Sequence, residues 1–197
     1  MTKLGCLALL AALILGSPAF AWTPDEVSSK RLAQGQPYLE VTPDPAGSSG
    51  LVRAGIEIAA TPERVWAVML DCALAKRMVT NLRSCRVLER DPRGRWDVRE
   101  QISAPPFFPT IRVIIRADYD PPHGYRFRRS GGDLPVLEGE WRLEPLDGGR
   151  RTRVLYESRA TLPFSAPGTV ARLFLRHEVA QALIGLRRES QAQGAGP

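Results

Sequence analysis

Residues 51–70 have the sequence LVRAGIEIAATPERVWAVML, in which a strand runs directly into a capped helix. The first half alternates apolar and polar residues, which is the period of a half-buried β-strand. Thr61 then stands where a side-chain oxygen caps a helix, and Pro62 follows where a missing N–H does no harm. The apolar residues of the helix recur at helical spacing, at Val65, Trp66, Val68 and Met69. This stretch therefore predicts a strand followed by a helix.

The residues before this stretch predict export. Lys3 gives a short positive segment, and an apolar run of signal-peptide length follows at residues 7–15. Small residues then precede a cleavage point after Ala21, so we predict that residues 1–21 are a signal peptide and that the mature protein is periplasmic or secreted. An uncleaved membrane anchor is the alternative, but the apolar run is too short to span a bilayer comfortably. Cys6 lies before the apolar run instead of after it, which argues against lipidation.

The positive charge of the chain comes almost entirely from arginine and is spread along the sequence. The formal net charge is +6. A nucleic-acid-binding protein would gather such charge into a stripe with aromatic residues interleaved, so we expect no nucleic-acid partner. Solvated strand faces explain the pattern better, and transient contact with an anionic membrane surface is compatible with it. The arginines that show this spread are Arg93, Arg95, Arg126, Arg128, Arg129, Arg150 and Arg151.

Cys72 and Cys85 are the two cysteines that follow the signal peptide. An even number in an oxidising compartment favours a disulfide, and their spacing suits a link between the end of the first helix and the start of the next strand. On the chain-entropy description, such a loop stabilises the fold by about 3 kcal/mol. Two buried free thiols or a metal site are the alternatives. A metal site is disfavoured because no histidine is near and no CxxC spacing occurs.

The rest of the chain is a series of strands separated by turn sequences and followed by one long helix. Residues 22–50 are rich in Pro, Gly and Ser and are expected to form an N-terminal extension with one short strand at 38–41. The helix is expected over residues 168–190, and residues 191–197 are expected to be a disordered tail. The expected strands of the domain at 51–190 are 51–58, 86–89, 95–102, 110–119, 125–129, 137–143 and 151–161.

These elements predict an α+β fold with a single core. The sheet, of about six to seven antiparallel strands, has one apolar face, and the long C-terminal helix must lie across it. A strongly curved sheet that wraps around a helix leaves space between the two, which is a natural apolar pocket.

Three segments follow one another in a characteristic order and spacing. They are IEIAATPERVWAVMLD at 56–71, LEGEWRLEPLDGGRRTRVLYES at 137–158 and LRHEVAQALIGLRRES at 175–190. Together they resemble the START-like (SRPBCC) superfamily, and are most similar to its coenzyme Q-binding and polyketide cyclase-like branch. The resemblance covers residues 51–190. It implies a helix-grip fold, in which the curved sheet grips the C-terminal helix around a hydrophobic cavity.

We expect a ligand to lie between the inward rows of the sheet and the inner stripe of the helix. Residues 104–109 and 162–167 contain prolines, which cannot join a sheet ladder, so we expect these segments to be gates. The expected lining is Val98, Ile102, Ile111, Val113, Ile115, Phe127, Trp141, Val154, Leu173, His177, Ala180 and Ile184. Alternation also places four polar residues inward, namely Glu100, Arg129, Tyr156 and Ser158. These either meet a ligand head group or form a mutual ion pair or a cavity mouth.

The sequence contains none of the common catalytic motifs, and we expect no cofactor and no metal. His123 lies in a turn, and His177 is more typical of a hydrogen-bonded core residue than of a base. We therefore expect a protein that binds a lipid, isoprenoid, quinone or aromatic molecule and shields or carries it. The alternative is a cyclase or dehydratase in which Glu100, Tyr156 or His177 assists proton transfer. A third interpretation is an interaction module with a collapsed cavity.

Overall fold

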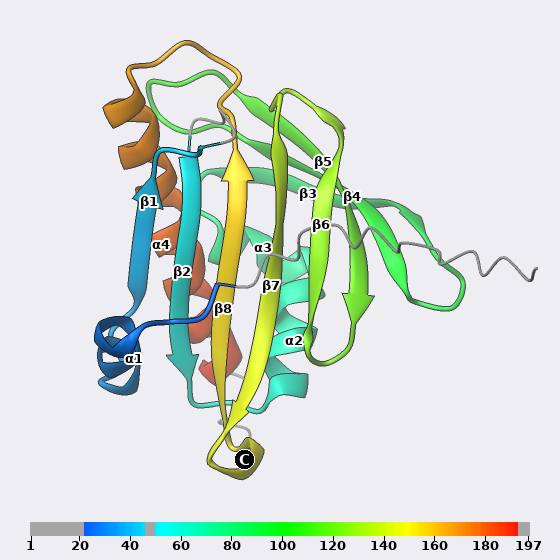
Figure 1. Ribbon diagram of the computed structural model, residues 1–197. Coiled ribbons are helices and arrows are strands. Elements are labelled where there is room, and N and C mark those ends of the chain that lie inside the picture. The colour runs from blue at the N-terminus through cyan, green and yellow to red at the C-terminus, as the bar shows by residue number, and fades with distance from the viewer. Residues whose placement is uncertain (1–21, 46–49, 193–197) are drawn as a thin grey trace, which may run out of the picture.

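The computed structural model describes residues 22–45 and 50–192. One sheet of eight antiparallel strands curves around a long C-terminal helix, α4 (Gly168–Ala192), which lies on its concave side (Figure 1). The strand order is β1-β2-β8-β7-β6-β5-β4-β3. The strands are β1 (Tyr38–Thr42), β2 (Gly50–Ile58), β3 (Leu82–Arg90), β4 (Trp96–Ser103), β5 (Ile111–Asp120), β6 (Gly124–Gly132), β7 (Leu137–Leu146) and β8 (Arg151–Ala160), with a 3-10 turn, η1 (Asp147–Gly149), between the last two.

The α+β helix-grip fold predicted from the sequence is confirmed, and the sheet has more strands than the expected number. The additional strand is β1, which pairs with β2 so that Tyr38 stands opposite Gly55. The N-terminal extension thus contributes an edge strand and a helix, α1 (Glu26–Ala33). The C-terminal helix continues to Ala192, beyond its expected end. The expected signal peptide, at residues 1–21, lies outside the described residues, as does most of the expected tail.

Two short helices follow β2 where the sequence predicted one. Thr61 caps α2 (Pro62–Leu70) by accepting a hydrogen bond from a backbone N–H of the first turn. Asp71 ends this helix and caps the next, α3 (Cys72–Met78), in the same way. Cys72 therefore opens the second helix instead of closing the first, because the Asp71 side chain starts a new helix before the chain can turn away.

A disulfide joins Cys72, at the start of α3, to Cys85 in β3. The two Cα atoms are 5.3 Å apart, and the bond closes a loop with a sequence separation of 13. The link predicted from the cysteine spacing is therefore present, and it fastens α3 to the edge strand of the sheet.

Reduction of this disulfide is expected to lower the free energy of unfolding by about 3 kcal/mol, because the open loop regains chain entropy in the unfolded state. The domain should stay folded, since it has a core of its own. Thermal unfolding with and without reductant measures the difference. A Cys72→Ala/Cys85→Ala variant is the control and should not respond to reductant. Complete alkylation of both thiols in the native protein without reduction would contradict the prediction.

The buried apolar side chains form two clusters, one toward each end of α4. One cluster includes Ile56, Ile58, Val65 and Leu183, and the other includes Val52, Ile111, Leu162 and Leu175. Tyr156 and Val179 pack against both. No helix in residues 22–45 and 50–192 has the length and hydrophobicity needed to cross a membrane.

Candidate ligand-binding cavity

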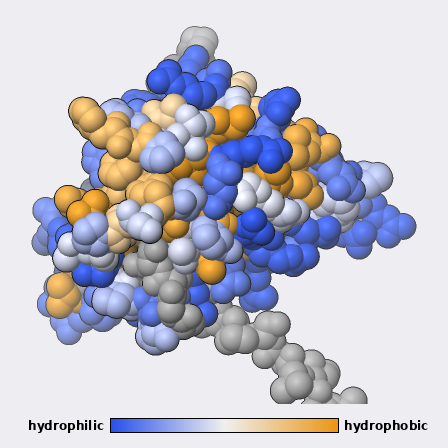
Figure 2. Space-filling model, turned by 90° about the horizontal axis from the view of Figure 1, so that it is seen from above, coloured by the Kyte–Doolittle hydropathy of each residue, from blue (hydrophilic) through white to orange (hydrophobic). Residues whose placement is uncertain are grey.

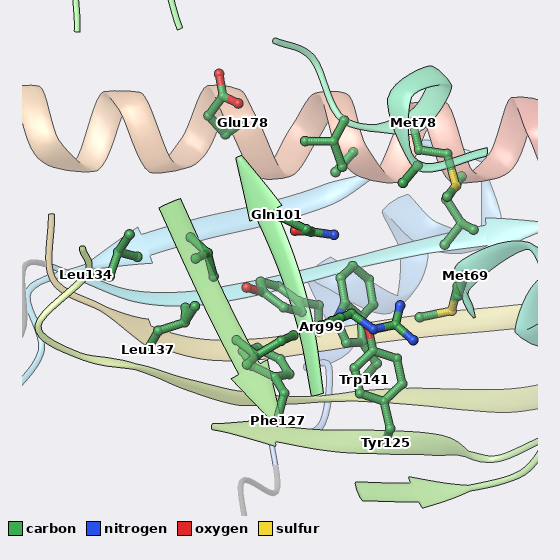
Figure 3. A pocket seen from close by; sticks show the side chains of 17 residues that line it. Met69, Met78, Arg99, Gln101, Tyr125, Phe127, Leu134, Leu137, Trp141 and Glu178 are labelled. Atoms are coloured by element: carbon green, nitrogen blue, oxygen red, sulfur yellow. The ribbon is translucent and has the colours of Figure 1, made fainter. Parts of the chain in front are cut away.

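A cavity of about 300 Å³ lies between the concave side of the sheet and α4, where the two core clusters meet. Figure 3 shows side chains from the sheet, from α4 and from the helices after β2 converging on it. Its walls are mostly apolar. The lining residues are Met69, Ala75, Met78, Val79, Arg99, Gln101, Val113, Ile115, Tyr125, Phe127, Leu134, Leu137, Trp141, Tyr156, Glu178, Ala182 and Leu186.

Aromatic rings from three neighbouring strands form one wall of the cavity. The Phe127 and Tyr156 rings stack with centroids 6.1 Å apart, and the Trp141 and Tyr156 centroids are 4.3 Å apart. Gly139 makes this packing fit, because a Cβ there would lie 2.8 Å from Phe127 Cζ and 2.2 Å from the Glu157 carbonyl oxygen. Burial raises the pKa of Tyr125, which also lines the cavity, to about 12. Rings held in this way offer a flat apolar surface to a ligand.

A buried ion pair faces the cavity from β4. Arg99 is 5% exposed, and its Nε and Nη2 donate to the two Asp97 carboxylate oxygens at 3.1 and 2.6 Å. Nη2 also donates to the Tyr119 hydroxyl at 2.7 Å. Burial alone lowers the pKa of Arg99, but the hydrogen bonds to Asp97 and the charge interactions with Tyr125, Tyr119 and Asp97 together more than offset it. The pKa is therefore raised and the guanidinium stays charged. Figure 3 shows this group among the rings of Tyr125 and Trp141.

Other polar groups at the cavity carry no permanent positive charge. Burial raises the pKa of Tyr156 to about 12, and a hydrogen bond with Ser158 partly offsets this. Burial likewise raises the pKa of Glu178 on α4. The Glu178 carboxylate is directed away from the sheet in Figure 3, and therefore away from Arg99. Gln101 is the remaining polar lining residue. Within the described ranges, no three His, Cys, Asp or Glu side chains are arranged to hold a metal ion.

The structure brings together one group of the predicted site residues. Five of them line the cavity, namely Val113, Ile115, Phe127, Trp141 and Tyr156. Three more, Ile111, Val154 and Ser158, are buried beside it without lining it. All eight lie on strands in which the alternate apolar positions face the concave side of the sheet.

The inward face predicted for β4 is wrong. Val98, Glu100 and Ile102 lie on the opposite side from Arg99 and Gln101, which line the cavity. Glu100, 2% exposed, forms ion pairs with Arg86 and Arg112, and the Arg112 Nε–Glu100 Oε1 distance is 2.7 Å. These hydrogen bonds, that of Arg86 first, lower the pKa of Glu100. The long arginine stems cover the apolar side chains of the convex face, so the apolar row of β4 faces outward.

Arg129 also lies outside the cavity. Its side chain is exposed, and its Nε and Nη2 donate to the backbone carbonyl oxygens of Leu134 and Gly132. A register shift between Ile114 and Ile115 on the neighbouring strand interrupts the ladder at this point. Arg129 itself still pairs with Ile115, and the interruption comes directly after it. Its side chain leaves the cavity because it binds the carbonyl oxygens of the turn after β6.

The inner stripe predicted for the C-terminal helix is wrong as well. Leu173 is 69% exposed, His177 and Ile184 are also exposed, and Ala180 is half-buried without lining the cavity. The inner stripe instead includes Ala171, Leu175, Glu178, Ala182 and Leu186. Because this stripe contains the charged residue Glu178, a prediction from hydrophobicity alone selects the neighbouring face of the helix, which carries Leu173 and Ile184.

Several cavity residues were missed from the sequence. Tyr125 precedes Phe127 by two positions, so strand alternation could have found it. Arg99 and Gln101 gave no such indication, because they occupy the polar positions of an alternating strand. Met69 comes from the predicted helix, which was not assigned to a cavity, whereas Ala75, Met78 and Val79 come from α3 and its end, which were not predicted.

The fold and the cavity can be compared with known proteins. TTHA0849 of Thermus thermophilus is 25% identical, with a TM-score of 0.63 over 74% of this chain and 99% of that chain. The Zhui aromatase/cyclase of Streptomyces sp. R1128 is 18% identical, with a TM-score of 0.61 over 74% of this chain and 96% of that chain. A STAR-related lipid transfer protein of Xanthomonas axonopodis is 17% identical, with a TM-score of 0.63 over 79% of this chain and 92% of that chain.

At such identities the last two proteins share the fold alone with this chain. No curated protein is detectably similar to it in sequence. The family profile described as polyketide cyclase / dehydrase and lipid transport matches residues 58–187, which run from the end of β2 to near the end of α4. The chain therefore belongs to this family within the START-like superfamily.

Proposed function

We propose that the protein binds a hydrophobic or amphipathic small molecule, such as a lipid, isoprenoid, quinone or aromatic compound, and carries it shielded from water. The observation that carries this proposal is an apolar cavity of about 300 Å³ with one buried guanidinium on its wall. Ligand pockets span about 300–1,000 Å³. The size favours a compact ring system or a single chain over a lipid with two long chains.

We infer that Arg99 orients the ligand. A guanidinium has five N–H donors, and Asp97 and Tyr119 engage three of them. The two donors on Nη1 are then the groups that meet a ligand oxygen. A charged donor in an apolar cavity favours a carboxylate, phenol or carbonyl over a pure hydrocarbon. The ligand class that fits is therefore apolar with one oxygen function.

Carriage is favoured over the cyclase or dehydratase alternative. Of the three residues that the sequence suggested for acid–base assistance, only Tyr156 lines the cavity, while Glu100 and His177 lie outside it. With a pKa of about 12, Tyr156 stays protonated at neutral pH and donates hydrogen bonds instead of acting as a base. These placements support binding without covalent chemistry.

Mass spectrometry of the protein purified under native conditions tests the proposal. A bound apolar molecule with an oxygen function is expected in the organic extract and as a mass shift of the intact complex. The same measurement on the denatured protein is the control, because a covalent adduct would survive denaturation. Native protein that carries no ligand, and that binds none of a panel of fatty acids, quinones and aromatic ketones, would refute the proposal.

The two segments expected to be gates meet at one end of the cavity. The Phe108 ring stacks on the Phe164 ring, with centroids 5.2 Å apart. The centroid of Phe108 is also 5.0 Å from that of Phe174 on α4. Phe164 and Phe174 pack against the core cluster that contains Leu134, a lining residue. This aromatic triad therefore joins the β4–β5 loop, the β8–α4 loop and α4 over the cavity. We propose that it is the gate.

We further propose that this end of the molecule contacts a lipid surface transiently. Figure 2 looks down on it and shows hydrophobic residues gathered among hydrophilic ones. Phe107 is fully exposed and has a φ of 66°, a backbone conformation that bulky residues rarely adopt. Val170 and Leu173 are exposed on the first turns of α4, beside Arg172. Exposed apolar residues flanked by arginine are typical of surfaces that bind anionic membranes.

A Phe107→Ser variant is expected to bind vesicles that contain anionic lipid about 10-fold more weakly, because insertion of a phenylalanine contributes about 1.5–3 kcal/mol. Co-sedimentation with phosphatidylglycerol vesicles measures the loss. Leu88→Ser is the matched control, since Leu88 is also exposed but lies on β3. Equal binding by all three proteins, or an equal loss in both variants, would contradict the assignment of this surface.

A further inference from the structure

A row of charged residues crosses the convex face of the sheet, which is the face opposite α4. Residues directly opposite one another on neighbouring strands share a face, so the strand register defines the row. Acid and base alternate along it except at one point, where two acids are neighbours. From β1 to β5, the row consists of Glu40, Arg53, Glu157, Glu140, Arg126 and Asp118.

The exception is the pair of Glu157 on β8 and Glu140 on β7, whose side chains are only 8% and 6% exposed. Arg53 Nε lies 3.2 Å from Glu157 Oε1, and Arg126 Nε lies 3.5 Å from Glu140 Oε2. Arg142 Nε is 3.1 Å from Glu140 Oε1, but this buried oxygen accepts no well-aligned hydrogen bond among the described residues. Burial is the main cause that raises the pKa of Glu140, and the charge of Glu157 adds to it. Two acids thus stand directly opposite one another, and one buried oxygen of the pair, Glu140 Oε1, is left without a well-aligned donor among the described residues.

Trp22, the first described residue, contacts Glu157 of this pair and the neighbouring Arg142. Its backbone nitrogen is 2.9 Å from Glu157 Oε2, and its carbonyl oxygen accepts a hydrogen bond from Arg142 Nη2. The indole stacks on the Tyr38 ring, with centroids 5.5 Å apart and planes at 17°. Figure 1 shows this start of the chain (dark blue) crossing the face of the sheet opposite α4. Three contacts of different kinds thus hold Trp22 in place, and one of them is made by its backbone nitrogen.

We propose that the Glu157–Glu140 pair is the binding site of a free α-ammonium group on Trp22, produced by cleavage between Ala21 and Trp22. Hydrolysis of this amide by an endopeptidase of the export machinery consumes a water molecule. The departing segment keeps a carboxylate at Ala21, and the Trp22 nitrogen becomes an amine that takes up a proton. An amide nitrogen donates a single N–H, whereas an ammonium group has three donors and a positive charge. That charge completes the alternation of acid and base along the row.

The resulting stabilisation depends on pH. An α-amino group ordinarily titrates at about 7.7–8.0, and neighbouring carboxylates raise its pKa in the folded protein. The contribution to stability is therefore complete below the pKa of the unfolded state and is lost as the pH rises through the higher folded value. The charged or titratable groups around the Trp22 nitrogen are Glu157, Glu140, Arg53, Arg142, Tyr38 and Glu40.

Two measurements test the proposal. Intact mass and N-terminal sequencing of the protein purified from the cell envelope should show Trp22 as the first residue. Two purified forms, one beginning at Trp22 and one that retains Ala21, should differ in Tm. The Trp22 form should melt about 2–4 °C higher near neutral pH, and the difference should disappear above about pH 10, where the amine is neutral. A different first residue, or equal Tm values at neutral pH, would overturn the proposal.

Matched variants locate the effect. Glu157→Gln should abolish the Tm difference between the two forms, whereas Glu144→Gln, on the same face of β7 but about half exposed, should preserve it. An NMR titration of the Trp22 α-amino group in the wild-type mature protein needs no variant. It should show a pKa above the ordinary range. A value within about 7.7–8.0 would show that the carboxylates do not bind the ammonium group.

Discussion

Replacement of Arg99 by leucine is expected to lower the free energy of unfolding by about 3–5 kcal/mol. Asp97 is 1% exposed, and both of its carboxylate oxygens accept hydrogen bonds from Arg99. Removal of the guanidinium leaves this carboxylate unpaired in the interior, where water cannot replace the lost partner. Urea unfolding followed by circular dichroism measures the difference between the wild type and the variant.

The double variant Asp97→Leu/Arg99→Leu is the matched control. Replacement of both members of a buried ion pair by apolar residues is often neutral, so most of the lost stability should return. The recovered protein should nevertheless lose the ligand found in the wild type, because its cavity no longer has a charged donor. A double variant as unstable as the single one would show that the loss comes from packing and not from the stranded carboxylate.

A second large effect is expected from Ala182→Phe on α4. Ala182 lines the cavity of about 300 Å³, and a ring at this position would occupy the space of the proposed ligand. Forcing extra side-chain volume into a filled space costs about 1–3 kcal/mol, so ligand affinity should fall by about 10- to 100-fold. Native mass spectrometry and a binding titration with the extracted molecule measure the change.

Ala180→Phe is the matched control for this substitution. Ala180 lies on the same helix, two positions away, and does not line the cavity. Both variants should keep the circular dichroism of the wild type, and only Ala182→Phe should lose ligand. If the two variants retain ligand equally, the molecule binds elsewhere and the cavity is not its site.

The fold could be predicted because its determinants are local. The strand and capped helix of residues 51–70 each have a clear period and a clear boundary, and later strands alternate cleanly between turn sequences. The sequence even predicted β1 as a short strand, but this strand was not counted among those expected in the sheet. The split between α2 and α3 was missed because Asp71 serves both helices, as the end of one and the cap of the other.

The cavity could be predicted only in part. Strand alternation locates its apolar lining residues, but its polar lining residues do not follow that pattern. Alternation placed Val113, Phe127 and Trp141 correctly on the concave side, since apolar side chains there face other apolar side chains. On β4 the same rule failed, because Arg99 is buried by its pairing with Asp97 and not by its hydrophobicity. Only tertiary pairing shows which polar residue can be buried, and a single sequence does not contain that information.

The aromatic triad of Phe108, Phe164 and Phe174 has a consequence for kinetics. The rings touch through dispersion contacts, and separating them breaks no strand ladder. With this triad as the proposed gate, ligand entry and exit would not need to cross the barrier for global unfolding. Exchange of ligand should be fast compared with amide hydrogen exchange in β2 and β8, whose ladder opens only when the whole sheet does. The proposed carrier would thus combine a durable scaffold with a short residence time for its ligand.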